Sequence, residues 1–117
     1  MDQEQMKHRT KEFAKRVIGL CRQLPENREG RWIAGQLFRS GTSVGSNYRA
    51  ACRGRSRPDF IAKLGIVLEE ADETLFWLEL IVETKILRPE LVAALMKEAD
   101  ELVAIFVSSL NKAKGRK

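Results

Sequence analysis

The sequence predicts an all-α protein, an antiparallel up-down-up-down four-helix bundle in one domain that spans residues 1–117. Three observations support this fold class. Apolar residues recur every three or four positions in four successive segments, no segment alternates as a strand would, and only short turns separate the segments. Amphipathic helices joined by short turns pack antiparallel to their neighbours. A chain of 117 residues is also long enough to bury one core.

The first helix is expected over about residues 7–24. Phe13, Val17 and Leu20 recur there at helical spacing, with lysines and arginines on the other side. Pro25 follows, and a helix usually ends at or before the residue that precedes a proline. The first turn is therefore expected over the few residues after Leu24.

The second helix is expected to run without a break from about Arg28 to Arg53, although residues 40–47 have the composition of a loop. The helical phase survives across those residues, which a loop would have scrambled. Each interior glycine costs about 0.5–1 kcal/mol relative to alanine, but small residues such as Gly41 and Gly45 let two helices approach closely. The rival interpretation, a phosphate-cradling loop, fits no Walker pattern and has no strand before it. The predicted buried face comprises Ile33, Leu37, Gly41, Val44, Tyr48 and Ala51.

The third and fourth helices are expected to begin at prolines. Ser56 lies three residues before Asp59, which is capping-box spacing, and Pro58 falls in the first turn, where its missing N–H costs nothing. Pro89 similarly opens the fourth helix, which is expected to reach about Leu110. Residues 111–117 are expected to form a frayed basic tail.

From Leu75 onward the third helix is apolar nearly all round, which a surface helix of a monomer should not be. Excess apolar surface of this kind usually marks an interface. The alternative is that the bundle covers all of it internally. The predicted subunit interface consists of Phe76, Trp77, Leu80 and Ile81.

Positive charge is concentrated in one quarter of the chain. Residues 28–57 carry seven arginines against the single acid Glu29, a formal +6, whereas the whole chain carries +5. Residues 1–27 sum to +2, residues 58–110 to −7 and the tail to +4. Such asymmetry indicates either polyanion binding or self-complementary packing between subunits. The candidate binding residues are Arg28, Arg31, Arg39, Arg49, Arg53, Arg55 and Arg57.

The sequence does not predict an enzyme, and it predicts neither a cofactor nor a metal site. The single histidine, His8, lies near one end, and a nucleophilic site needs a positioned base. The glutamates of the third helix have the spacing of an exposed face. Cys21 and Cys52 are expected to be small core residues; a disulfide and a reactive thiol are the alternatives. The polar first residues and the lack of a long apolar run favour the cytoplasm.

Two functions remain open for the arginine face. In the first, arginine forks bind the phosphates of a nucleic acid, with structured RNA the expected partner. In the second, the face meets the acidic third helix of a neighbouring subunit or of a partner protein, and the chain is a scaffold or adaptor. Arg49 and Arg53, four residues apart, repel each other by a few tenths of a kcal/mol, which favours an anion opposite them.

Residues 39–81 resemble the core signature of the four-helix-bundle proteins named after the 23S rRNA intervening sequence. The resemblance rests on the Arg-Ser…Ser-Val…Asn-Tyr-Arg run, the Ser-x-x-Asp-Phe turn and the Glu-Ala-Asp-Glu-Thr-Leu-Phe-Trp-Leu-Glu-Leu run. It implies an antiparallel bundle that assembles into a homopentamer. A related branch, the accessory proteins of diversity-generating retroelements, implies a cationic surface, nucleic-acid binding and a reverse transcriptase as partner. Many members carry Glu where this chain has Ala50, so no ion pair of that Glu is expected here.

Overall fold

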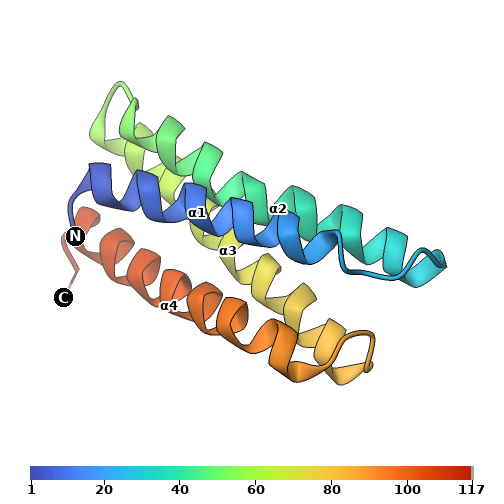
Figure 1. The fold of residues 1–117 in the computed structure, drawn as a ribbon. Coiled ribbons are helices and arrows are strands. Elements are labelled where there is room, and N and C mark those ends of the chain that lie inside the picture. Colours follow the sequence, from blue (N-terminus) through green and yellow to red (C-terminus); the bar gives the residue numbers. More distant parts are fainter. Residues whose placement is uncertain (117) are drawn as a thin grey trace.

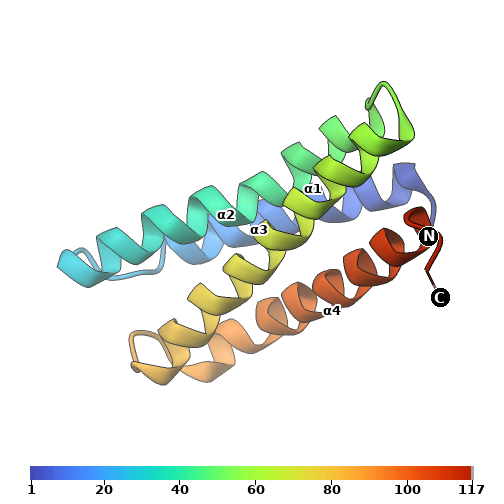
Figure 2. The ribbon, with the colours of Figure 1, turned by 180° about the vertical axis from the view of Figure 1, so that it is seen from behind.

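The computed structural model describes residues 1–116, which form four long helices joined by short turns (Figure 1). The helices are α1 (Gln3–Cys21), α2 (Arg28–Cys52), α3 (Arg57–Glu83) and α4 (Pro89–Ala113). Successive helices run antiparallel, so both chain ends and the α2–α3 turn lie at one end of the molecule (Figures 1 and 2). The molecule measures 44 × 24 × 21 Å. The predicted all-α four-helix fold is confirmed.

α2 is one continuous helix through residues 40–47, as its apolar phase predicted. The two central glycines face α1 at very short range. A methyl group on Gly41 would lie 2.6 Å from Val17 Cγ1, and one on Gly45 would lie 3.2 Å from the carbonyl oxygen of Thr10. The glycines therefore allow a close approach of α1 and α2, and the phosphate-loop alternative is wrong.

α1 begins at Gln3, four residues before the predicted start near Lys7. Asp2 and Gln5 form a capping box: the Gln5 N–H donates to the Asp2 carboxylate at 2.8 Å, and the Asp2 N–H donates to the Gln5 side chain at 2.9 Å. This box satisfies two backbone donors that would otherwise lack partners, which lets the helix start earlier. α1 also ends at Cys21, and residues 22–24 form a turn ahead of the proline.

α4 extends to Ala113 instead of ending near Leu110. Gly115 adopts a left-handed conformation with φ of 76°. Its N–H donates to the Lys112 carbonyl and the next N–H donates to the Asn111 carbonyl, which is a Schellman ending. The first part of the predicted frayed tail is thus helical. Lys117, the last residue of that tail, lies outside the described residues.

One core runs the length of the bundle and draws on all four helices. Phe13 of α1, Leu37 of α2, Leu78 of α3 and Phe106 of α4 are completely buried. α2 packs between α1 and α3, α3 packs between α2 and α4, and the contact of α1 with α4 is the sparsest. The order of the helices around the core therefore places α1 and α2 on one side and α3 and α4 on the other (Figure 1).

A bidentate ion pair bridges the sparse α1–α4 seam. The guanidinium of Arg9 donates to both carboxylate oxygens of Glu98 at 2.7 Å, and it reaches Glu101 at 3.0 Å. The hydrogen bond from Arg9 to Glu98 is the main cause that raises the pKa of the arginine. Paired, partly buried forks of this kind are among the stronger charge interactions, and this one ties α1 to α4 where few apolar contacts do so.

Candidate nucleic-acid interface

All seven candidate arginines are exposed on the molecular surface. Four belong to α2, a fifth is its C-cap residue, one lies in the α2–α3 turn and one opens α3. On the opposite face of α2, Leu37, Val44 and Tyr48 are buried. The predicted separation of charged and apolar faces is therefore confirmed, while the binding role of the arginines stays a prediction.

Two of these arginines connect different helices through their guanidinium groups. Arg39 forms ion pairs with Glu70, at 3.2 Å, and with Glu73, both on α3. Arg57 donates two hydrogen bonds, of 2.9 and 2.6 Å, to the carbonyl oxygen of Ala113 at the C-terminal end of α4. Arg39 thus links α2 to α3, and Arg57 links α3 to α4, so their charges are largely committed to the fold.

Three others lie near the ends of α2. Arg31 donates to the backbone carbonyl of Glu26 at 3.1 Å, close to the α1–α2 turn. Arg28 lies one turn earlier on the same surface. Arg55 is exposed in the α2–α3 turn, where its backbone N–H donates to Asp59. These arginines are separated by most of the length of α2, so they do not form one compact site.

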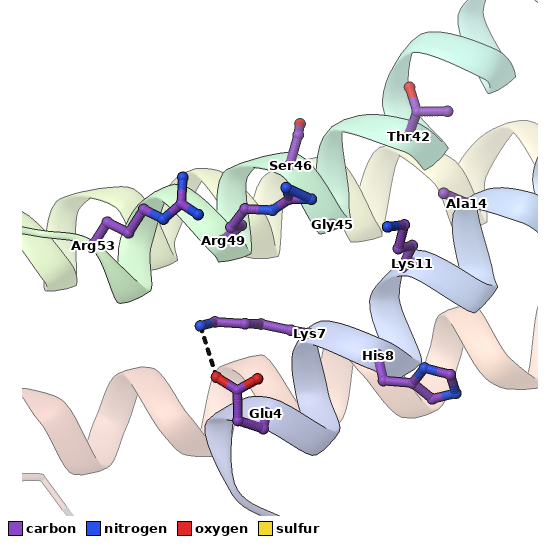
Figure 3. A pocket seen from close by; sticks show the side chains of 10 residues that line it. All are labelled: Glu4, Lys7, His8, Lys11, Ala14, Thr42, Gly45, Ser46, Arg49 and Arg53. Atoms are coloured by element: carbon purple, nitrogen blue, oxygen red, sulfur yellow. Dashed lines mark hydrogen bonds and ion pairs between the residues drawn. The ribbon is translucent and has the colours of Figure 1, made fainter.

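The remaining two arginines line a groove between α1 and α2, about 690 Å³ in volume, called the α1–α2 groove below (Figure 3). Arg49 and Arg53 form its α2 wall, and Lys7 and Lys11 form its α1 wall. Glu4 is the single acid in the lining and pairs with Lys7 at 3.0 Å. Four cations against one carboxylate give the groove a strongly positive field. The other lining residues are His8, Ala14, Thr42, Gly45 and Ser46.

Lys7 and Lys11 were missed as site residues. They are four apart on the polar side of α1, so they lie on one face of that helix. The signal was present in the sequence, because residues 1–27 are also basic and precede the arginine-rich segment in an antiparallel pair. Only the packing of α1 on α2 shows which lysines come to face Arg49 and Arg53.

The helix order separates charge of opposite sign onto two sides of the molecule. Residues 1–57, which form α1, α2 and the α2–α3 turn, sum to a formal +8. Residues 58–110, which form most of α3 and α4, sum to −7. The α1–α2 side is called the basic side below and the α3–α4 side the acidic side.

The predicted oligomer interface is partly corrected by the structure. Phe76 is 50% exposed, and Trp77 and Leu80 are half-buried. Ile81 is 0% exposed, because it points into the bundle core, so it cannot contact another subunit. Trp32 of α2, which the prediction missed, is 59% exposed beside these residues. Trp32, Phe76, Trp77 and Leu80 form the aromatic patch.

The aromatic patch is ordered by specific contacts. The rings of Trp32 and Trp77 meet edge to face with centroids 5.4 Å apart. The indole N–H of Trp77 donates to Glu73 at 3.0 Å, and that carboxylate also holds Arg39. A cleft of about 430 Å³ lies beside the two indoles, which line it together with Arg28 and Leu80. The patch lies toward the other end of α2 from the α1–α2 groove.

The described residues show no second constellation with evident chemistry. Both cysteines are free and pack against the core, as expected. Burial raises the pKa of the Cys21 thiol to about 11, so its thiolate is scarce at neutral pH. Within residues 1–116, no group of three metal-ligating side chains comes together, and none of the four helices has the length and apolar character of a membrane span.

These features define a four-helix bundle with one basic and one acidic side. The chain belongs to the family of 23S rRNA-intervening sequence proteins, whose family model matches residues 3–108. It is similar to the crystal structure of a protein of unknown function from the S23 ribosomal protein family of Bacteroides thetaiotaomicron. The two chains are 35% identical and superpose with a TM-score of 0.86 over 95% of this chain and 99% of the other. No protein of curated function matches the chain.

The predicted membership of the intervening-sequence family is thus confirmed. The related branch, the accessory proteins of diversity-generating retroelements, is not among the matches described above. That link stays a prediction.

Proposed function

We propose that this protein is a non-enzymatic, cytoplasmic bundle that assembles into oligomers and binds RNA through its basic side. The observation that carries the proposal is the α1–α2 groove, where four cations face one acid. Arginine and lysine near a phosphate chain release condensed counterions, which supplies most of the affinity of sequence-independent binding. Membership of a family connected by its name with rRNA agrees with an RNA partner.

The proposal separates the seven arginines by role. Arg49 and Arg53 line the groove and are its central contacts. Arg28, Arg31 and Arg55 extend the positive surface toward the two ends of α2. Arg39 and Arg57 are bound to groups on neighbouring helices and contribute less, because an incoming phosphate must compete with those partners.

A pair of matched double variants tests this assignment. Arg49→Gln/Arg53→Gln should elute from heparin at markedly lower salt than the wild type and should bind RNA weakly. Arg28→Gln/Arg39→Gln removes the same charge from the same helix outside the groove and should have a much smaller effect. Far-UV circular dichroism verifies that both variants remain helical. Equal retention of the two variants would refute the groove as the site.

The oligomer is proposed to form through the aromatic patch. Exposed apolar surface of this kind usually marks an interaction site, and the family resemblance suggests a homopentamer. Phe76→Asp should yield a smaller species in light scattering, and Trp77→Asp should do the same. Phe76 is half exposed, so its substitution tests the interface with little risk to folding. An unaltered mass in both variants would remove the patch from the interface.

A second candidate function follows from the opposite charges of the two sides. The basic side of one subunit could pair with the acidic side of a neighbour or of a partner protein, as Arg39 pairs with Glu70 and Glu73 within one chain. The protein would then be an assembly scaffold or adaptor. A salt titration that follows mass and RNA binding together separates the candidates. An oligomer that dissolves with salt while no RNA binds at any salt concentration supports the scaffold.

The protein partner proposed from the resemblance is an RNA-handling enzyme such as a reverse transcriptase. No surface in the bundle points to that enzyme specifically, so the proposal rests on the resemblance to retroelement accessory proteins. The genes beside the one that encodes this chain provide the test, because accessory proteins of that kind act together with a retroelement's reverse transcriptase. A neighbourhood without one would remove this partner.

A further inference from the structure

We infer that the α1–α2 groove takes a single strand of nucleic acid and excludes a duplex. The inference rests on the proposed function and deepens it, because it states the form of the nucleic acid. Three properties of the groove carry it: the separation of its walls, the position of the cations on both walls, and the small residues of its floor.

The separation of the walls is set by glycine contacts. A methyl group on Gly45 would lie 3.2 Å from the carbonyl oxygen of Thr10, and one on Gly41 would lie 2.6 Å from Val17. Helices in ordinary contact have axes about 8–10 Å apart, and at these glycines no side chain of α2 keeps the two backbones apart. A valley between two touching helices is narrower than one helix, which is about 10–12 Å across, whereas the major groove of a B-form duplex alone is about 12 Å wide and the whole duplex is wider still. A duplex therefore rests on the rims, whereas a single strand can enter.

The cations that line the groove come from both of its walls. Lys7 and Lys11 extend from α1, and Arg49 and Arg53 extend from α2 (Figure 3). Because α1 and α2 are antiparallel, Gly45 lies opposite Thr10, so Arg49 comes level with the turn that carries Lys7. A single strand in the channel can contact cations of both walls. Its phosphates then offset the mutual repulsion of the four cations.

The floor of the groove leaves room for sugars and bases between the charged walls. Ala14, Thr42 and Gly45 lie there, with Ser46 at the outer edge on α2, and none of these side chains is larger than threonine. The lined stretch of α2 covers about 16 Å at 1.5 Å per residue, enough for about four stacked nucleotides at 3.4 Å each.

Charge alone predicts the opposite preference, which makes the inference testable. Duplexes release more counterions per contact than single strands, with salt slopes of about −0.9 against about −0.7 per phosphate. A protein that only senses charge therefore favours the duplex. The experiment uses three probes: a fluorescein-labelled 12-nucleotide RNA, the same RNA annealed to its complement, and inorganic polyphosphate. Fluorescence anisotropy measures binding of both RNAs at several salt concentrations, and polyphosphate serves as competitor.

We expect the single strand to bind at least about tenfold more tightly than the duplex, with a salt slope near −3 from about four phosphates. Equal or tighter duplex binding would overturn the inference. Displacement of the RNA by polyphosphate at equal phosphate concentration would also overturn it, because the groove would then be selective for a linear polyanion and not for a nucleic acid.

A blocked groove gives an independent test without any change of charge. Ser46 is exposed at the α2 rim of the groove (Figure 3), so Ser46→Trp should narrow the entrance of the channel without disturbing the core. Ser108 is also exposed, on α4 and outside the lining, and Ser108→Trp is the matched control. We expect Ser46→Trp to lower the affinity for the single strand at least about tenfold and to change the affinity for the duplex little. Ser108→Trp should bind both RNAs as the wild type does.

The outcomes distinguish this inference from the proposed function. If Arg49→Gln/Arg53→Gln loses RNA while Ser46→Trp binds the strand normally, the basic side binds RNA but the strand does not lie in the groove. If the arginine variant retains RNA binding, the proposed function itself fails. Loss of the strand in both variants supports the two together.

Discussion

Substituting Gly41 by alanine should destabilise the bundle, although alanine is the better helix former. Gly41 is buried at the centre of α2, and its added methyl group would lie 2.6 and 2.7 Å from the two γ-carbons of Val17. Ordinary carbon contacts are about 3.5–4.0 Å, so the shortfall is about 1 Å. Val17 is completely buried, and a valine in a helix has one strongly preferred rotamer. The neighbour therefore cannot turn away, and the helices must separate.

The expected magnitude follows from two opposing terms. Replacing a helix-interior glycine by alanine gains up to about 1 kcal/mol. Overpacking a well-filled core costs about 1–3 kcal/mol, and a shortfall of this size places Gly41→Ala toward the upper end. The net loss in the free energy of unfolding should be about 2 kcal/mol.

The same helix supplies the control. Gly35 is exposed on α2, and a methyl group there would meet nothing within 4 Å. Gly35→Ala should therefore gain up to about 1 kcal/mol. Urea denaturation followed by far-UV circular dichroism gives both values, provided the denaturant slopes agree.

Two results would refute this reasoning. The first is a Gly41→Ala protein as stable as Gly35→Ala, which would mean that α1 and α2 are not held by the glycine contact. The second comes from a double-mutant cycle with Val17→Ala. The cost of Gly41→Ala should shrink in that background, because the clashing methyl groups are gone, and additive effects would exclude Val17 as the cause.

Two further predictions concern helix ends. Lys85 follows α3 with a φ of 63°, a conformation that costs a residue with a Cβ about 1–2 kcal/mol; Lys85→Gly should raise the melting temperature by several degrees, and an unchanged or lower value would contradict the strain. A hydrogen bond from Lys63, helped by the N–H of Arg55, lowers the pKa of Asp59. Because the folded pKa lies below the unfolded value of about 3.9, the stability that Asp59 contributes is present above that pH and is lost as pH falls through the folded pKa. The wild type should thus exceed Asp59→Asn in stability at pH 7 but not at pH 2, and a difference that persists at pH 2 would contradict the prediction.

The continuity of α2 could be predicted because its apolar phase is a property of spacing alone. Leu37, Val44 and Tyr48 return to the same side at 100° per residue, whatever the composition between them. The start of α1 was less predictable, since the apolar pattern begins after the cap. Asp2 and Gln5 have capping-box spacing, but only the folded helix shows that both hydrogen bonds form.

The candidate sites were predictable only in part. Spacing places Phe76 and Ile81 on the same apolar helix, yet it does not say which of the two faces the bundle. The structure buries Ile81 and exposes half of Phe76, because the direction of the core is set by where α2 and α4 pack. For the same reason Trp32, on the polar face of α2, could not be assigned to the aromatic patch from its own helix.

The sequence by itself determined four amphipathic helices, their turns and a surplus of positive charge in the first half of the chain. These are local properties, fixed by the period of a helix and by residues close in sequence. The tertiary structure decided which charged side chains meet: Arg39 pairs with the carboxylates of α3, and Arg49 lies across from Lys7. Such pairings depend on how closely two helices approach, and here the missing side chain of Gly45 sets that distance.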